Sequence, residues 1–111
     1  MKLSFVTLLL AAGLAAWGQQ AMPRMTSVEP QNGKVGDVLV VTGENLQKDA
    51  VAKVYLTDGK HDVECTITEQ TDTTIKITIP AKATGRLAVM VLTTGKDAKY
   101  IEQPVKVQID Q

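Results

Sequence analysis

Few residues of this chain could act as nucleophiles or bases. After residue 18 the sequence contains one His, one Cys and one Ser, namely His61, Cys65 and Ser27. His61 and Cys65 are four residues apart on a predicted strand, and at ~3.3 Å per residue this separates them by about 13 Å. They therefore cannot form a catalytic dyad within that strand, and no G-x-S-x-G elbow surrounds Ser27. The sequence predicts that the protein is not an enzyme.

Acidic side chains are the other potential source of chemistry, because carboxylates bind metal ions. Five of them lie in or near predicted turns: Asp37, Asp49, Asp58, Asp62 and Asp97. A transition-metal site would need more His or Cys ligands, and no D-x-D-x-D-G loop is present. Asp is also frequent in turns, where it binds nearby backbone groups. We expect no cofactor and no metal, and a weak calcium site built from several loops is the alternative left open.

The charge balance argues against nucleic acid as a partner. The 111 residues contain 12 Lys and Arg and 12 Asp and Glu, so the net charge is zero. No basic run with interleaved aromatic residues occurs, and no phosphate-binding loop of the G-x-x-x-x-G-K-[ST] type. We therefore expect no nucleic-acid binding.

The N-terminal segment has the pattern of a secretory signal peptide. Lys2 precedes an apolar run over residues 3–16, and small residues follow it. The run is shorter than the ~20 residues that a membrane-spanning helix needs. We expect residues 1–18 to be cleaved, with cleavage after Ala21 as the alternative, and residues 19–22 to form a short flexible tail. The protein would then be periplasmic or extracellular, with no membrane insertion. The single Cys excludes an intramolecular disulfide, which suits a bacterial envelope.

The rest of the chain predicts an all-β fold. Residues 19–111 include 12 Val, 12 Thr and 6 Ile, and no window has a helical apolar stripe. Turn residues divide this part into seven expected strands: 25–28, 35–42, 50–57, 62–68, 75–79, 86–93 and 99–109. Gln31–Lys34 is expected to be a turn, Asp58-Gly59 a hairpin, and Pro104 an edge or bulge position. About seven short antiparallel strands indicate an immunoglobulin-like β-sandwich, with an open barrel as the alternative.

A specific resemblance appears in the segment from Pro23 to Leu46. It resembles the opening of an IPT/TIG domain, through Pro30, Gly33, Gly36 and the Gly43-Glu44-Asn45 turn. Pro80, Gly85 and the apolar run after them resemble the second half of the family, so the match covers most of residues 23–109. Leu46 departs from the pattern, because the family often has an aromatic residue there. The resemblance implies one immunoglobulin-fold domain over residues 23–111. By analogy with adhesion and receptor modules, it also implies a non-enzymatic binding role.

One apolar surface is predicted from the strand at 86–93. The run from Leu87 to Leu92 is apolar on both faces. If Leu87, Val89 and Val91 face the core, then Met90 and Leu92 face outward. In an immunoglobulin-like fold the third, sixth and seventh strands are neighbours. The hypothesis that follows is that Tyr55, Met90, Leu92 and Tyr100 form one outward patch. Cover by loops, or a bulge that reverses the faces, is the alternative.

These features predict an exported binding module. Its expected partner is another envelope or extracellular protein, in protein–protein interaction or adhesion. A polysaccharide is the first alternative, although only Tyr55 and Tyr100 remain as aromatic residues after cleavage. The second alternative is a structural spacer or assembly subunit that pairs through an edge strand. Pro104, Lys99 and Lys106 would instead protect such an edge.

Overall fold

The computed structural model describes residues 22–110, and all regular structure in this range is β-strand. The strands are β1 (Arg24–Glu29), β2 (Asn32–Lys34), β3 (Val38–Glu44), β4 (Val51–Thr57), β5 (Asp62–Gln70), β6 (Thr74–Thr78), β7 (Gly85–Thr93) and β8 (Tyr100–Asp110). The described residues contain no helix long and apolar enough to cross a membrane. The predicted signal peptide, residues 1–18, lies outside the described part of the chain.

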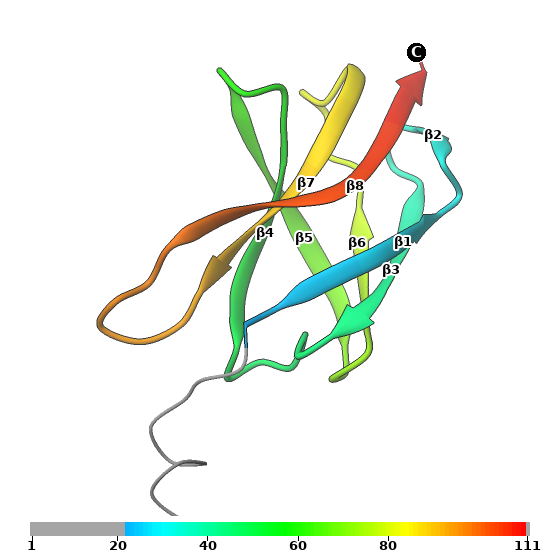
Figure 1. Ribbon diagram of the computed structural model, residues 1–111. Coiled ribbons are helices and arrows are strands. Elements are labelled where there is room, and N and C mark those ends of the chain that lie inside the picture. Colours follow the sequence, from blue (N-terminus) through cyan, green and yellow to red (C-terminus); the bar gives the residue numbers. More distant parts are fainter. Residues whose placement is uncertain (1–21, 111) are drawn as a thin grey trace, which may run out of the picture.

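The strands form two layers that share β5. Their hydrogen-bonded order is β1-β3-β6-β5-β4-β7-β8-β2 (Figure 1). Residues 62–65 of β5 pair with β4, whereas residues 66–70 pair with β6. The strand thus passes from one layer to the other and curls the sheet around a single core. The predicted immunoglobulin-like β-sandwich is confirmed.

The core is aliphatic because the inward positions of the alternating strands carry Leu, Ile and Val. In β6, Ile75 and Ile77 are fully buried, whereas Lys76 between them is exposed. This is the burial pattern that their alternation predicts. Leu46, where the family often has an aromatic residue, is also fully buried. Among the described residues, no aromatic side chain belongs to the buried cluster. Tyr55 and Tyr100 are therefore not part of the core.

The prediction for residues 31–42 is wrong in one respect. Asn32–Lys34, expected as a turn, is strand β2 and pairs in parallel with Gln108–Asp110 of β8. The turn follows it, where the N–H of Asp37 donates to the carbonyl of Lys34 at 2.9 Å and Gly36 has φ of 93°. Strand β3 consequently begins at Val38 and not at Val35. A three-residue strand that pairs with the far end of the chain has no local periodicity by which to detect it.

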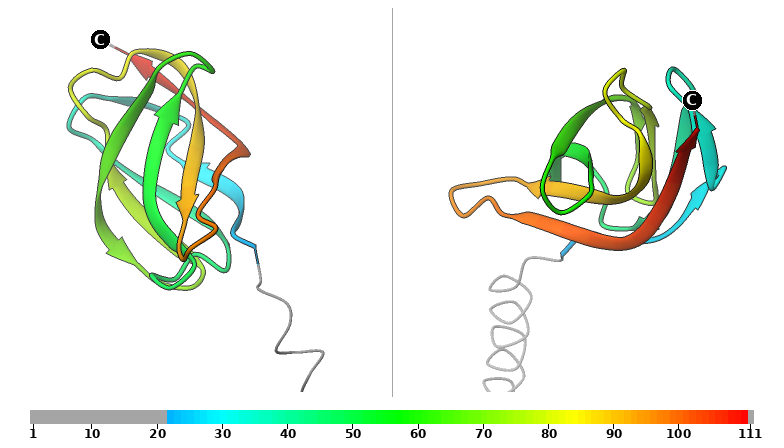
Figure 2. Two further views of the ribbon diagram at one scale, coloured as in Figure 1. Left: turned by 90° about the vertical axis from the view of Figure 1, so that its left-hand side faces the viewer. Right: turned by 90° about the horizontal axis from the view of Figure 1, so that it is seen from above.

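Pro104 lies in a bulge of β8, as its missing N–H predicts. Ala88 of β7 is opposite Lys106, and Met90 is opposite Glu102, so β8 contains extra residues between these pairs. Beyond the bulge, β7 and β8 continue as a hairpin that projects from the body of the domain (Figures 1 and 2). This hairpin positions both surfaces that are described below.

Candidate functional site

Strands β4, β7 and β8 bring the four predicted patch residues together. Tyr55 of β4 is directly opposite Met90 of β7, and Leu92 of β7 is opposite Tyr100 of β8. The three strands lie side by side in the left view of Figure 2, in green, yellow-orange and orange-red. We call Tyr55, Met90, Leu92 and Tyr100 the outer patch.

The direction of the outer patch follows from strand parity. The residues that alternate with it on β4 and β7 are fully buried in the core: Val54, Leu56, Val89 and Val91. Because successive side chains of a strand point to opposite faces, the outer patch lies on the solvent side of the sheet. Leu87, Val89 and Val91 belong to the buried core cluster.

Exposure differs among the members of the outer patch. Tyr100 is 61% exposed, whereas Met90, on the middle one of the three strands, is only 8% exposed. Tyr55 and Leu92 are half-buried. Tyr100 is therefore the most exposed member of the outer patch, and Met90 is its buried member.

The two tyrosine rings touch edge to face. Their centroids are 5.6 Å apart and their planes are inclined by 62°. Partial burial raises the pKa of the Tyr55 hydroxyl to about 12, and the Tyr100 hydroxyl and the carboxylates of Glu64 and Asp62 add to this effect. The Tyr55 ring is thus a neutral, amphipathic group near neutral pH.

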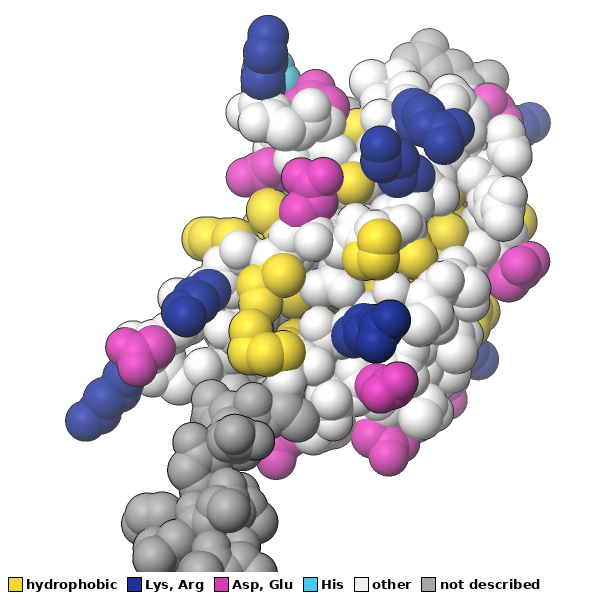
Figure 3. Space-filling model, in the orientation of Figure 1, with side chains coloured by type: hydrophobic (Ala, Val, Ile, Leu, Met, Phe, Trp, Pro, Cys, Tyr) yellow, Lys and Arg dark blue, Asp and Glu magenta, His cyan; other side chains and the backbone are white. Residues whose placement is uncertain are grey.

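Charged side chains of both signs surround the outer patch. Glu64 is opposite Tyr55, Glu102 is opposite Met90, and Lys53 is opposite Leu92. The Lys53 ammonium is 3.9 Å from the Glu64 carboxylate, with both side chains half exposed. Figure 3 shows the same mixture of signs around exposed hydrophobic side chains on the face that it presents. An apolar centre with a mixed polar rim is the usual composition of a protein-recognition surface.

The residues that could have carried catalysis are separated. Cys65 is buried, and burial raises the pKa of its thiol to about 12. His61 is exposed at the β4–β5 turn, where its Nδ1 lies 3.4 Å from the Asp58 carboxylate. Ser27 is exposed on β1. Within residues 22–110, no three His, Cys, Asp or Glu side chains come together as a group that could hold a metal ion.

Two of the turn carboxylates bind backbone, as expected for Asp in turns. Asp37 Oδ2 accepts the N–H of Lys34 at 3.0 Å. Asp58 Oδ1 accepts the N–H groups of Lys60 and His61 at 2.8 and 2.7 Å. These hydrogen bonds give both residues a structural role in shaping turns.

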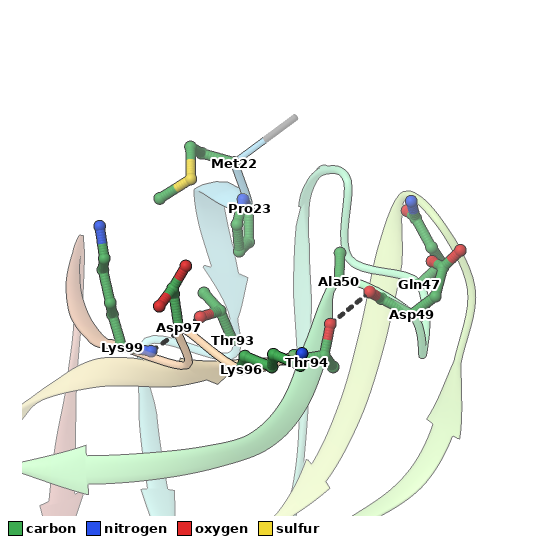
Figure 4. A pocket seen from close by; sticks show the side chains of 11 residues that line it. Met22, Pro23, Gln47, Asp49, Ala50, Thr93, Thr94, Lys96, Asp97 and Lys99 are labelled. Atoms are coloured by element: carbon green, nitrogen blue, oxygen red, sulfur yellow. Dashed lines mark hydrogen bonds between the residues drawn. The ribbon is translucent and has the colours of Figure 1, made fainter. Parts of the chain in front are cut away.

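A groove that was not predicted from the sequence lies beside the β7–β8 hairpin. It is lined by three segments that are far apart in the chain, around Pro23, Asp49 and Thr94 (Figure 4). No single segment carries a motif, so only the folded arrangement reveals this site.

The family model of the IPT/TIG domain matches residues 23–109. This chain belongs to the IPT/TIG domain family. The motif residues of this IPT/TIG domain shape the backbone, since Asn45 and Gly36 adopt positive φ angles of 58° and 93°. No curated protein is similar enough in sequence to count as a relative.

Several solved structures have a similar fold. A Bacteroides thetaiotaomicron protein of unknown function has a TM-score of 0.68 at 22% identity, over 82% of this chain and 22% of that one. A gamma-CGTase from alkalophilic Bacillus clarkii has 0.63 at 24% identity, over 83% and 13%. An auxiliary nutrient binding protein from Bacteroides ovatus has 0.59 at 23% identity, over 82% and 21%. The IPT/TIG domain thus spans between 13% and 22% of these proteins, and the likeness concerns the fold.

Proposed function

We propose that this IPT/TIG domain is a non-enzymatic binding module that recognises a protein partner through the outer patch. The observation that carries the proposal is the exposure of Tyr100 at 61%, directly beside half-buried Leu92 and Tyr55. Tyr is enriched at protein interfaces because a rigid apolar ring and a polar hydroxyl lose little entropy on binding. The aliphatic core leaves both tyrosines available for this role.

We further propose that the module works outside the cytoplasm. Residues 1–18 have the pattern of a signal peptide, with residues 19–22 as a tail before the domain. The partner would then be a protein of the bacterial envelope or of the surroundings of the cell. Adhesion and assembly of surface complexes are the processes in which such a module would act.

The test is retention of envelope proteins on the immobilised, purified protein. The variant Tyr100→Ser removes the exposed ring, and Val38→Ser is the matched control because Val38 is 45% exposed on β3, outside the outer patch. Half of each extract is treated with protease beforehand. We expect the wild type and Val38→Ser to retain a protein from the untreated extract. Retention should be lost with Tyr100→Ser and in the extract treated with protease.

The opposite results would overturn the proposal in distinct ways. Retention that survives protease would indicate a non-protein ligand. Equal retention by the wild type and Tyr100→Ser would exclude the outer patch as the contact. Absence of any retained protein would favour a structural spacer.

Polysaccharide binding is a second candidate, which the contact between Tyr55 and Tyr100 brings forward. Stacking on a sugar chain is favoured when aromatic faces lie open in one plane. The 62° inclination of the two rings instead directs the edge of one ring at the face of the other. This geometry favours the compact contacts of a protein partner over an extended sugar platform.

A further inference from the structure

The groove beside the β7–β8 hairpin is a formed cavity of about 610 Å³. Ligand sites commonly measure ~300–1,000 Å³. It is lined by the segment before β1, the β3–β4 loop and the hairpin turn: Met22, Pro23, Gln47, Asp49, Ala50, Thr93, Thr94, Gly95, Lys96, Asp97 and Lys99. In Figure 4, Asp97 and Lys99 lie on one side, Gln47 and Asp49 on the other, and Met22 and Pro23 above.

Hydrogen bonds between the three segments hold the walls of the groove in place. The Thr94 hydroxyl donates to the carbonyl of Asp49, which ties the hairpin to the β3–β4 loop. The buried side chain of Gln103 donates from Nε2 to the carbonyl of Pro23 at 3.5 Å, which ties β8 to the third segment. Such cross-links favour a cavity that exists before a ligand arrives.

The lining offers balanced charges and both kinds of hydrogen-bonding group. The carboxylates of Asp49 and Asp97 equal in number the ammonium groups of Lys96 and Lys99. The Oε1 atom of Gln47 is buried and has no hydrogen-bond partner among the described residues. Equal numbers of opposite charges favour a neutral ligand over an anion or a cation.

One wall of the groove is apolar. Pro23 and Met22 lie above the polar side chains in Figure 4, and Met22 is 52% exposed. Met22, the last residue of the predicted tail, is held at the groove because Asn45 Nδ2 donates to its carbonyl at 3.2 Å. A ligand that fits must therefore have a carbon–hydrogen face as well as groups that both donate and accept hydrogen bonds. Sugar rings combine these properties, because each hydroxyl is a donor and an acceptor and the ring has apolar patches.

We infer that this groove binds a short, neutral oligosaccharide. The site is separate from the outer patch, because Thr93 alternates with Leu92 on β7 and its side chain faces the opposite side of the sheet. The two surfaces lie on opposite faces of one hairpin. The inference is independent of the proposed protein partner, and either one can fail alone.

The test is an NMR titration of the purified protein with three neutral trisaccharides: cellotriose, maltotriose and mannotriose. The backbone amide signals of residues 47–50 and 93–99 should shift in a saturable way with at least one of them, at concentrations up to about 10 mM, where millimolar affinities are measurable. The signals of Tyr55 and Met90, on the other face, should stay in place.

Two exposed positions allow the groove to be weakened without unfolding the domain. Asp97→Asn and Lys99→Met each remove a charged hydrogen-bonding group and should raise the dissociation constant about tenfold. The control Lys82→Met changes another exposed lysine, in the β6–β7 loop outside the groove, and should leave the affinity unchanged. Thermal melting of each variant establishes that the fold is kept.

Three results would overturn the inference. The first is the absence of shifts with all three sugars. The second is a set of shifts centred on Tyr55 and Tyr100, which would place sugar binding on the outer patch. The third is equal weakening by Lys82→Met, which would show that the effect does not come from the groove.

Discussion

The Oε1 atom of Gln103 accepts a hydrogen bond of 2.8 Å from the backbone N–H of Met25, 78 residues earlier in the chain. Both residues are almost fully buried. No backbone ladder joins β1 to β8 within the described residues, so this side chain takes the place of one. The curled sheet is therefore closed by an amide, at the point where edge strand β1 meets the part of β8 that does not pair with β2.

The first prediction concerns this closure. Gln103→Leu leaves the N–H of Met25 buried without an acceptor, which costs about 1–3 kcal/mol of unfolding free energy. Urea denaturation should show a lower midpoint with an unchanged slope. Hydrogen exchange at Met25 should become faster at the same time.

Gln108→Leu is the matched control for this substitution. Gln108 is half-buried on the same strand, and its side chain makes no hydrogen bond within the described part of the chain. Equal destabilisation by the two substitutions would contradict the role assigned to Gln103.

The second prediction concerns the contact between β1 and β3 at Gly43. A Cβ atom on Gly43 would overlap the carbonyl oxygen of Arg24 and lie 2.8 Å from the Cα of Met25. Because backbone atoms cannot move aside cheaply, Gly43→Ala should destabilise the domain by about 3 kcal/mol or more. The measurement is the melting temperature together with the yield of folded protein.

Gly95→Ala separates this clash from the general effect of replacing a glycine. Gly95 has φ of 92° but no atom within 4 Å of an added Cβ. Gly95→Ala should therefore lower the free energy of unfolding only through backbone strain, by about 1 kcal/mol. A greater loss at Gly95 than at Gly43 would refute the argument from close approach.

Local patterns predicted those parts of the fold that depend on neighbours in sequence. The alternation around Ile75 and Ile77 identified β6 and its buried face, and the missing N–H of Pro104 identified the bulge. The parity of the run at 87–92 likewise indicated which side chains face outward. Each of these features is decided within a few residues of chain.

Other features depend on pairs of residues that are distant in sequence. Strand β2 pairs Gly33 with Ile109, near the other end of the chain. A Cβ added to Gly33 would lie 2.8 Å from Ile79 Cδ1. Met90 is buried although strand parity places it on the outer face. The groove forms only because Pro23, Asp49 and Thr94 lie close together in the fold. The apolar periodicity of the sequence does not predict this arrangement. The sequence therefore indicates which side chains share the outer face. It predicts neither how exposed each of them is nor the presence of the groove.

The third prediction concerns the reactivity of Cys65. Burial raises the pKa of the thiol to about 12, and the charge of Glu64 acts in the same direction. The thiolate is the reactive form, so alkylation by iodoacetamide at pH 8 should be at least about a hundredfold slower in the folded protein than in denaturant. Mass spectrometry over time measures both rates. Similar rates in the two states would contradict the buried position of this side chain.

The last prediction concerns acid stability and Asp58. Hydrogen bonds from the backbone N–H groups of His61 and Lys60 lower the pKa of this carboxyl to about 2. Because the unfolded chain has a pKa of about 3.9, ionised Asp58 stabilises the folded state above that pH. This contribution is lost as the pH falls through about 2. In Asp58→Asn, which cannot ionise, the contribution is absent at every pH.

The melting temperatures of the wild type and Asp58→Asn should therefore differ most at pH 5 and converge between pH 4 and pH 2. The matched control is Asp97→Asn, which removes one carboxylate from an exposed turn where no N–H of the described residues donates to it. An equal pH-dependent change in both variants would mean that overall charge, and not the turn at Asp58, governs stability in acid. Convergence in Asp58→Asn alone would assign this part of the acid response to the two backbone hydrogen bonds of that turn.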